Sequence, residues 1–152
     1  TDDFLDIILN DVELDLIQLH GSESPDRVAK IASRTEKSVM KVIPVAEERD
    51  VKYAESYFEV ADWLLFDAKP PDTLEGALPG GNAITFDWEL LSGKVWPLPW
   101  MLAGGLSVKN VADAIRITRA PVVDTSSGTE DNPGFKNPHK IRRFLKEVEN
   151  CK

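Results

Sequence analysis

The sequence predicts an α/β protein in which parallel strands alternate with helices. Short apolar runs, several of them rich in β-branched residues, alternate along the chain with amphipathic helical stretches. Several of these runs are almost continuously apolar, which is typical of parallel strands covered on both faces. Polar and glycine-rich residues follow the strands directly. Strand–helix repeats joined by right-handed crossovers form either an open doubly wound sheet or a closed (β/α)8 barrel.

The expected elements follow one another in order. The strands are apolar runs that end at polar or glycine residues, over residues 14–19, 38–45, 62–66, 100–103 and 121–123. The helices are amphipathic stretches, several with a capping residue, over residues 2–9, 22–33, 47–57, 87–91, 108–118 and 138–149. Ser107 is the expected cap of helix 108–118, and Asn137 or Pro138 begins the last helix. Residues 67–85 are rich in proline and glycine and predict a long loop, functional or mobile.

Composition excludes several classes of protein. The chain has 152 residues and a net charge of −8, so it suits one globular domain and argues against a nucleic-acid partner. One cysteine cannot form an internal disulfide, and two distant histidines supply no metal-ligand cluster. The apolar runs are too short to span a membrane, and no signal peptide opens the chain. We therefore expect a cytoplasmic protein with no membrane partner.

Two glycine-rich turns after strands are candidates for phosphate binding. Gly104 and Gly105 let the backbone approach a ligand, and the next helix directs its N–H groups at the same space. Ser126, Ser127 and Gly128 add two hydroxyls and further backbone donors. Each turn is also explained by glycine relieving backbone strain. As consecutive strand ends, however, they favour a phosphate site.

Carboxylates at two strand ends are candidates for chemistry. Asp67 ends an apolar strand, which suits a general acid or base, although a helix cap or a partner for Lys69 is the alternative. Asp124 is the analogous residue after the strand at 121–123, and it either serves the site or braces the following turn. His20 also follows a strand, but a lone histidine there is more often a hydrogen-bonded packing residue. Cys151, in a charged tail, is not expected to be a nucleophile.

Five motifs occur together in a specific order and spacing. They are LIQLHGSE (16–23), LLFDAK (64–69), PGGNAITFDW (79–88), LAGGLSVKNV (102–111) and VDTSSGTEDNPGFKN (123–137). Over essentially its whole length the chain resembles the phosphoribosylanthranilate isomerases of tryptophan biosynthesis. The resemblance implies a (β/α)8 TIM barrel and a cofactor-free Amadori rearrangement. In that reaction N-(5′-phosphoribosyl)anthranilate becomes 1-(2-carboxyphenylamino)-1-deoxyribulose 5-phosphate.

The resemblance also implies roles for individual residues. Asp67 matches the general acid that protonates the furanose ring oxygen, and Asp124 matches an aspartate that faces the anthranilate amine. The phosphate-binding loops match the turns described above, namely Gly104, Gly105, Ser126, Ser127 and Gly128. The expected partner is thus a small phosphorylated substrate, and no cofactor or metal is expected.

The departures from the family pattern concern the start of the chain. The family's general base is a cysteine in a Lys-x-Cys-Gly motif after its first strand, which this sequence lacks and Cys151 does not match. The family's arginine for the anthranilate carboxylate has no counterpart either. Residues 1–152 are therefore expected to form a single partial barrel with only strands four to eight. This chain alone would be expected to lack isomerase activity. The missing N-terminal segment of the enzyme would be its expected partner.

Three alternatives stay open. A related phosphosugar barrel, such as an indole-glycerol-phosphate synthase, would share the phosphate loops. A non-catalytic fragment that binds a phosphorylated ligand would lack only the base. An open doubly wound nucleotide-binding domain would require a Gly-x-Gly-x-x-Gly motif after an early strand, which is absent.

Overall fold

The structure, a computed structural model, describes residues 1–70 and 84–151. Most of the predicted loop 67–85, including the glycine pair at 80–81, lies outside these residues. The α-helices are α1 (Asp2–Asp11), α2 (Pro25–Thr35), α3 (Glu48–Tyr53), α4 (Val111–Thr118) and α5 (Pro138–Glu149). Short 3-10 helices are η1 (Ala54–Tyr57), η2 (Trp88–Leu91) and η3 (Ser127–Thr129).

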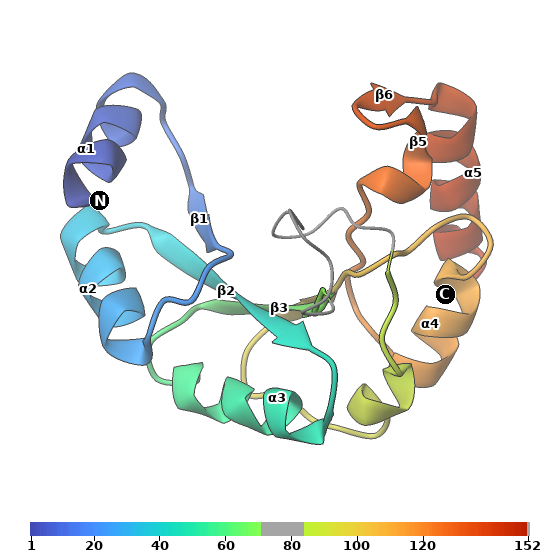
Figure 1. Cartoon of the computed structure of the whole chain (residues 1–152), viewed down its shortest axis with the longest axis horizontal. Coiled ribbons are helices and arrows are strands. Elements are labelled where there is room, and N and C mark those ends of the chain that lie inside the picture. The colour runs from blue at the N-terminus through green and yellow to red at the C-terminus, as the bar shows by residue number, and fades with distance from the viewer. Residues whose placement is uncertain (71–83, 152) are drawn as a thin grey trace.

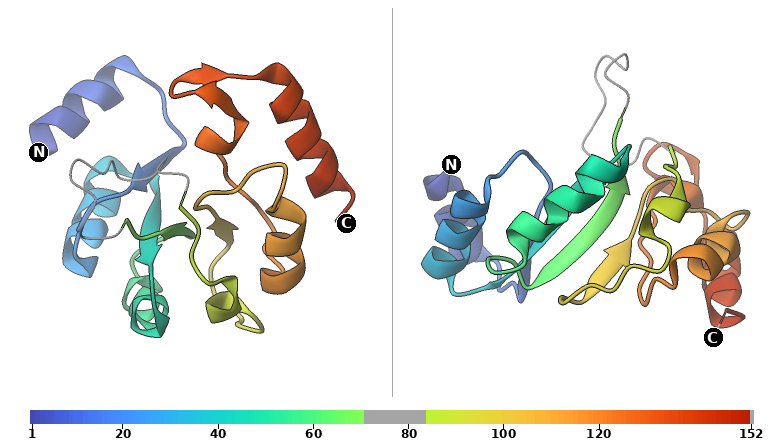
Figure 2. Two further views of the ribbon diagram at one scale, coloured as in Figure 1. Left: turned by 45° about the vertical axis from the view of Figure 1, so that its right-hand side comes forward. Right: turned by 90° about the horizontal axis from the view of Figure 1, so that it is seen from below.

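Parallel strands form the centre of the molecule. They pair in the order β1 (Leu16–Leu19), β2 (Ser38–Val45), β3 (Trp63–Ala68) and β4 (Trp100–Leu102). The helices lie along the outer side of this sheet, which is an open arc (Figure 1). Figure 2 shows α1 and α2 at one end of the arc and α4 and α5 at the other. Strands that are consecutive in the sequence are thus neighbours in the sheet, which is the usual arrangement for short crossover connections.

The predicted strand at 121–123 is not a full strand. Val123 makes one isolated parallel bridge to Leu102, with hydrogen bonds from Leu102 N to Val122 O and from Asp124 N to Leu102 O. Pro121 has no N–H to donate. Within residues 1–70 and 84–151, no strand pairs on the other side of this segment. Among the described residues this segment lies at an edge and pairs on one side, and Val123 also packs against the core.

Two further differences lie in the second half of the chain. Helix α4 begins at Val111, and Asn110 is its N-cap residue. The Asn110 side chain accepts a hydrogen bond from the Ser107 N–H at 2.7 Å, which closes a separate turn before the helix. Ser107 is therefore not the cap. An unpredicted hairpin, β5 (Glu130–Asn132) and β6 (Phe135–Lys136), turns at Gly134, whose φ of 82° suits glycine.

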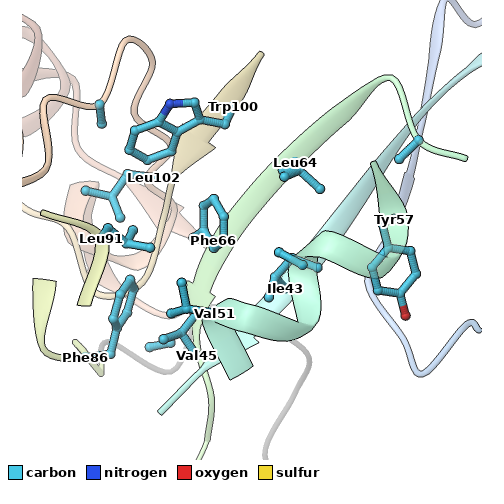
Figure 3. Packing of buried hydrophobic residues seen from close by; sticks show 14 of the residues in the cluster. Ile43, Val45, Val51, Tyr57, Leu64, Phe66, Phe86, Leu91, Trp100 and Leu102 are labelled. Carbon is cyan, nitrogen blue, oxygen red and sulfur yellow. The ribbon is translucent and has the colours of Figure 1, made fainter. Parts of the chain in front are cut away.

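Apolar residues pack on both faces of the sheet. The inner face carries a small cluster: Met40, Val42, Leu65 and Ala103. The outer face carries the larger core beneath the helices, in which Phe66 projects from β3 toward Leu91 and Leu102 (Figure 3). Phe66 also packs against Trp96 and Trp100, with ring centroids 4.6 and 5.7 Å away. Because residues alternate in a strand, the same strands supply both layers.

Candidate functional site

The Asp67 carboxylate lies at the carboxyl end of β3 and is almost fully buried. The side chain is 9% exposed. Its Oδ1 accepts a hydrogen bond from the Ala68 N–H at 2.8 Å, and its Oδ2 lies 3.3 Å from His20 Nε2. His20 follows β1, so the contact reaches across β2. A buried carboxylate with these partners has a fixed position, as a proton donor or acceptor requires.

The contact with His20 was not among the partners that the sequence suggested for Asp67. Those were Lys69 or an arginine, and His20 was considered chiefly as a hydrogen-bonded packing residue. In the structure the side chain in contact with Asp67 Oδ2 is His20, with Nε2 at 3.3 Å. Nothing local in the sequence indicates this pairing, because 47 positions separate the two residues along the printed sequence. The one usable signal was that both residues follow parallel strands, whose carboxyl ends meet at one edge.

The Gly104–Gly105 turn lies directly against Asp67. Gly104 has φ of +90°, and a Cβ at this position would lie 2.7 Å from the Ala68 backbone nitrogen and 3.2 Å from Asp67 Oδ1. Gly105 has φ of +59° and passes equally close to the Ile84 carbonyl. Only glycine fits such a backbone, so these residues bring main-chain groups next to the buried acid.

The second predicted phosphate turn packs against the first. A Cβ on Gly128 would overlap the Leu106 carbonyl oxygen, and Thr125 Oγ1 donates a hydrogen bond to that same oxygen at 2.7 Å. Ser127 begins the short helix η3. The structure thus brings both glycine-rich turns together at one end of the sheet, as their place after consecutive strands predicted.

A lysine that the sequence did not single out fixes Ser126. Lys136 Nζ donates hydrogen bonds to Ser126 O at 2.8 Å and Ser126 Oγ at 3.1 Å, and it pairs with the Glu130 carboxylate at 2.9 Å. Lys136 belongs to the unpredicted β5–β6 hairpin, so its approach to Ser126 depends on that turn. The hairpin therefore places the Lys136 ammonium group, paired with Glu130, beside the serine turn.

Asp124 lies in the electrostatic field of these same groups. Burial raises the pKa of its carboxyl, the negative charge of Asp67 raises it further, and the positive charges of Lys136 and His20 act in the opposite direction. Its side chain also lines a cavity of about 360 Å³ with Val123, Lys136 and apolar residues of α5. Asp124 thus lies within electrostatic range of Asp67, His20 and Lys136, and of these groups Asp67 and His20 are in direct contact.

Other kinds of site receive no support from the part of the chain that the structure describes. In residues 1–70 and 84–151 there is no group of three histidine, cysteine or acidic side chains that could hold a metal ion. The helices described there are too short or too polar to cross a membrane. Cys151 is exposed just after α5 and is well separated along the sequence from Asp67 and Asp124.

The arrangement defines an α/β protein whose acidic and glycine-rich groups gather at the carboxyl ends of parallel strands. Residues 1–147 match the family described as N-(5'phosphoribosyl)anthranilate (PRA) isomerase. The chain belongs to this family, as the five motifs indicated.

Relatives with curated names support the same assignment. The chain is 56% identical over 143 residues to the N-(5'-phosphoribosyl)anthranilate isomerase of Paramagnetospirillum magneticum, covering 93% of this chain and 65% of the relative. It is 53% identical over 151 residues to that of Ruegeria sp. strain TM1040, covering 98% of this chain and 69% of the relative. The chain thus spans about two thirds of the length of these relatives.

Solved structures agree in fold. The crystal structure of phosphoribosyl anthranilate isomerase from Thermotoga maritima superposes with a TM-score of 0.80 at 35% identity, covering 98% of this chain and 68% of that one. A phosphoribosyl anthranilate isomerase in complex with reduced 1-(o-carboxyphenylamino)-1-deoxyribulose 5-phosphate gives a TM-score of 0.74 at 32% identity, covering 98% and 66%. The α/β fold of this chain therefore matches about two thirds of these structures.

Proposed function

We propose that this chain supplies the general acid and the phosphate-binding turns of a phosphoribosylanthranilate isomerase. The observation that carries the proposal is the buried Asp67 carboxylate, held beside the Gly104–Gly105 turn. An acid and an anion-binding turn in contact can hold a phosphorylated sugar by one end and protonate it at the other. The family match favours this substrate over that of an indole-glycerol-phosphate synthase.

The reaction divides among the groups as follows. The main-chain donors of Gly104, Gly105, Ser126, Ser127 and Gly128 bind the phosphate, with the charge of Lys136 behind them. Asp67 donates its proton to the furanose ring oxygen, and the C1–O bond breaks to leave an iminium ion at C1. A base then removes the C2 proton, the enolamine forms, and it tautomerises to the ketone. Asp124 faces the anthranilate amine, where a carboxylate stabilises the positive nitrogen.

The base is proposed to come from the third of the relatives' length that this chain does not span. The single cysteine of the sequence, Cys151, is exposed near the end of α5 and suits no role at the strand ends. In this proposal the chain contributes strands four to eight of an eight-stranded barrel, as one partial domain over residues 1–152. Exposed Phe4 and Ile7 on α1, and Leu145 on α5, support further packing at both ends of the arc.

The test is complementation. The chain is co-expressed with the remaining third of the Paramagnetospirillum magneticum relative, and turnover is followed by the loss of anthranilate-type fluorescence. We expect turnover only when both parts are present, and we expect Asp67→Asn to lower it by about 10²- to 10⁴-fold. Asp87→Asn is the matched control, because Asp87 is exposed and caps η2, a role that asparagine also fills. Undiminished turnover when the Asp67→Asn chain is co-expressed with the remaining third of the relative would refute the role of Asp67 as general acid.

A second candidate, a phosphate-ligand-binding fragment without catalysis, is favoured by the missing base alone. Titration calorimetry of the isolated chain with the phosphorylated product analogue, taken together with the complementation assay, separates the two. Binding by the chain, with no turnover after complementation, would support the fragment. Turnover after complementation excludes it.

A further inference from the structure

A lysine is buried in the middle of β2, where the sequence pattern calls for an apolar residue. Lys41 is 2% exposed and lies between buried residues along the strand. Alternation places it on the same face as Val39 and Ile43, which belong to the core beneath the helices. Its ammonium group lies 5.7 Å from the centre of the Tyr57 ring. Lys41 therefore lies on the outer face of the sheet, and its charge does not face the space where substrate is proposed to bind.

All three protons of the Lys41 ammonium have acceptors on one turn. Nζ donates to Leu19 O at 3.3 Å, to Gly21 O at 2.7 Å and to Glu23 Oε2 at 2.9 Å. An ammonium group has three donors, so this set satisfies it completely. A buried charge is costly unless it is paired and hydrogen-bonded, and this one is both. The turn that follows β1 is thus built around Lys41.

Glu23 closes the same turn from the other side. Its Oε2 also accepts the Gly21 N–H at 3.0 Å, and its backbone carbonyl accepts the Tyr57 hydroxyl at 2.7 Å. Burial raises the pKa of the Glu23 carboxyl, but the hydrogen bonds and charge of Lys41 outweigh this and hold the pKa below its ordinary value. The carboxylate therefore stays ionised and keeps its hold on Gly21.

His20 lies between the two carbonyls that Lys41 binds. The backbone is anchored at Leu19 and at Gly21, so the direction of the His20 side chain is set from both sides. From this position Nε2 reaches to 3.3 Å from Asp67 Oδ2. Lys41 thus connects to the buried acid through two contacts, first to the turn and then through the imidazole.

We propose that Lys41 is a positioning residue which, through Glu23 and the 19–21 turn, holds His20 against Asp67. Its catalytic meaning rests on the proposed function, because it is Asp67 that acts on substrate there. The physical claim concerns only the contact between His20 and Asp67. It can therefore be tested in the isolated chain without any measurement of turnover.

The experiment reads the imidazole signals of the 152-residue chain by NMR. The sequence has two histidines, and His139 is exposed at the start of α5, so it serves as an internal reference. Asp67→Asn is expected to shift the ring signals of His20 and to leave those of His139 in place. In a Lys41→Met background, the same change is expected to shift His20 by less than about half as much, since contacting residues are energetically coupled.

A second variant disturbs the turn from its exposed side. A Cβ on Gly21 would lie 2.6 Å from Glu23 Oε1, the end of a flexible side chain, so Gly21→Ala displaces the carboxylate while Lys41 keeps its two carbonyl acceptors, Leu19 O and Gly21 O. It is expected to fold and to weaken the response of His20 to Asp67→Asn. This variant decides the question if Lys41→Met fails to fold.

Two controls separate positioning from general loss of stability. Lys52→Met removes an exposed lysine on α3, and Val111→Ala truncates a buried side chain on α4. Both are expected to leave the full response of His20 to Asp67→Asn. An undiminished response in Lys41→Met, or in Gly21→Ala where Lys41→Met is unfolded, would overturn the proposal. That result would leave the isomerase proposal standing, because complementation tests the latter separately.

Discussion

Replacing Gly104 by alanine tests how closely the glycine turn is fitted to the buried acid. The new Cβ would lie 2.7 Å from the Ala68 nitrogen, 3.0 Å from the Ala68 Cβ and 3.2 Å from Asp67 Oδ1. The left-handed backbone at φ of +90° costs an alanine about 1–2 kcal/mol. Overpacking against backbone costs typically about 1–3 kcal/mol more. The expected loss in the free energy of unfolding is thus about 2–5 kcal/mol.

Gly93→Ala is the matched control. Gly93 also has a positive φ, of +68°, but nothing lies within 4 Å of the position of its Cβ. Its expected loss is therefore the backbone strain alone, about 1–2 kcal/mol. Chains of this size lose about 2–4 °C in Tm per kcal/mol, so the two variants should differ by about 2–12 °C.

The assay is urea unfolding followed by tryptophan fluorescence, with thermal melts alongside. A second readout is the NMR signal of His20, which contacts Asp67. Gly104→Ala is expected to shift this signal, because Ala68 and Asp67 must move to admit the methyl group, and Gly93→Ala is expected to leave it unchanged. Equal losses of stability in the two variants, with an unmoved His20, would refute the close fit of the turn against Asp67.

Three further changes have expected outcomes. Asp124→Asn should raise the free energy of unfolding at pH 7, because the raised pKa of Asp124 in the folded state means that stability falls as the pH rises through that pKa. The stability difference between the variant and the unchanged chain should shrink as the pH is lowered toward 3.8, as measured by urea titrations at several pH values. Phe66→Ala should cost about 3–5 kcal/mol by the same method, because its buried ring packs against both Trp96 and Trp100. Asn137→Ala should cost about 1 kcal/mol, because the Asn137 side chain accepts hydrogen bonds from the His139 and Lys140 N–H groups at the start of α5. Asn137→Asp should retain most of the stability.

The sequence predicted best those elements whose residues decide their structure locally. Strand β2 has the predicted bounds, because eight largely apolar and β-branched residues admit few alternatives. Helix α5 begins at Pro138 after Asn137, as the capping pattern indicated. The segment 121–123 was predicted as a strand on the same grounds but forms only a bridge, since pairing depends on neighbours that local sequence does not reveal.

The candidate site was predictable to the extent that topology determines it. Parallel strands bring their carboxyl ends together, so the proximity of Asp67 to the Gly104 turn follows from the order of the strands. The roles of His20 and Lys136 were missed, because each depends on a contact between distant segments. Lys41 is the clearest case: nothing local in its apolar strand indicates a role for the charge, which becomes understandable only from the positions of Leu19 O and Gly21 O.

Three features fix the Asp67 carboxylate, and they can be disturbed separately. The N–H of the next residue, Ala68, binds one oxygen, His20 approaches the other, and Gly104, by lacking a side chain, leaves room for the Ala68 N–H and Asp67 Oδ1. Loss of any one constraint should displace the carboxylate without unfolding the sheet, because the constraints are a main-chain N–H, an imidazole and a glycine, whereas the large apolar side chains of the core carry most of the stability. Changes at His20 and Gly104 should therefore alter the position of Asp67 by different routes. Core changes such as Phe66→Ala should lower stability and leave that position as it is.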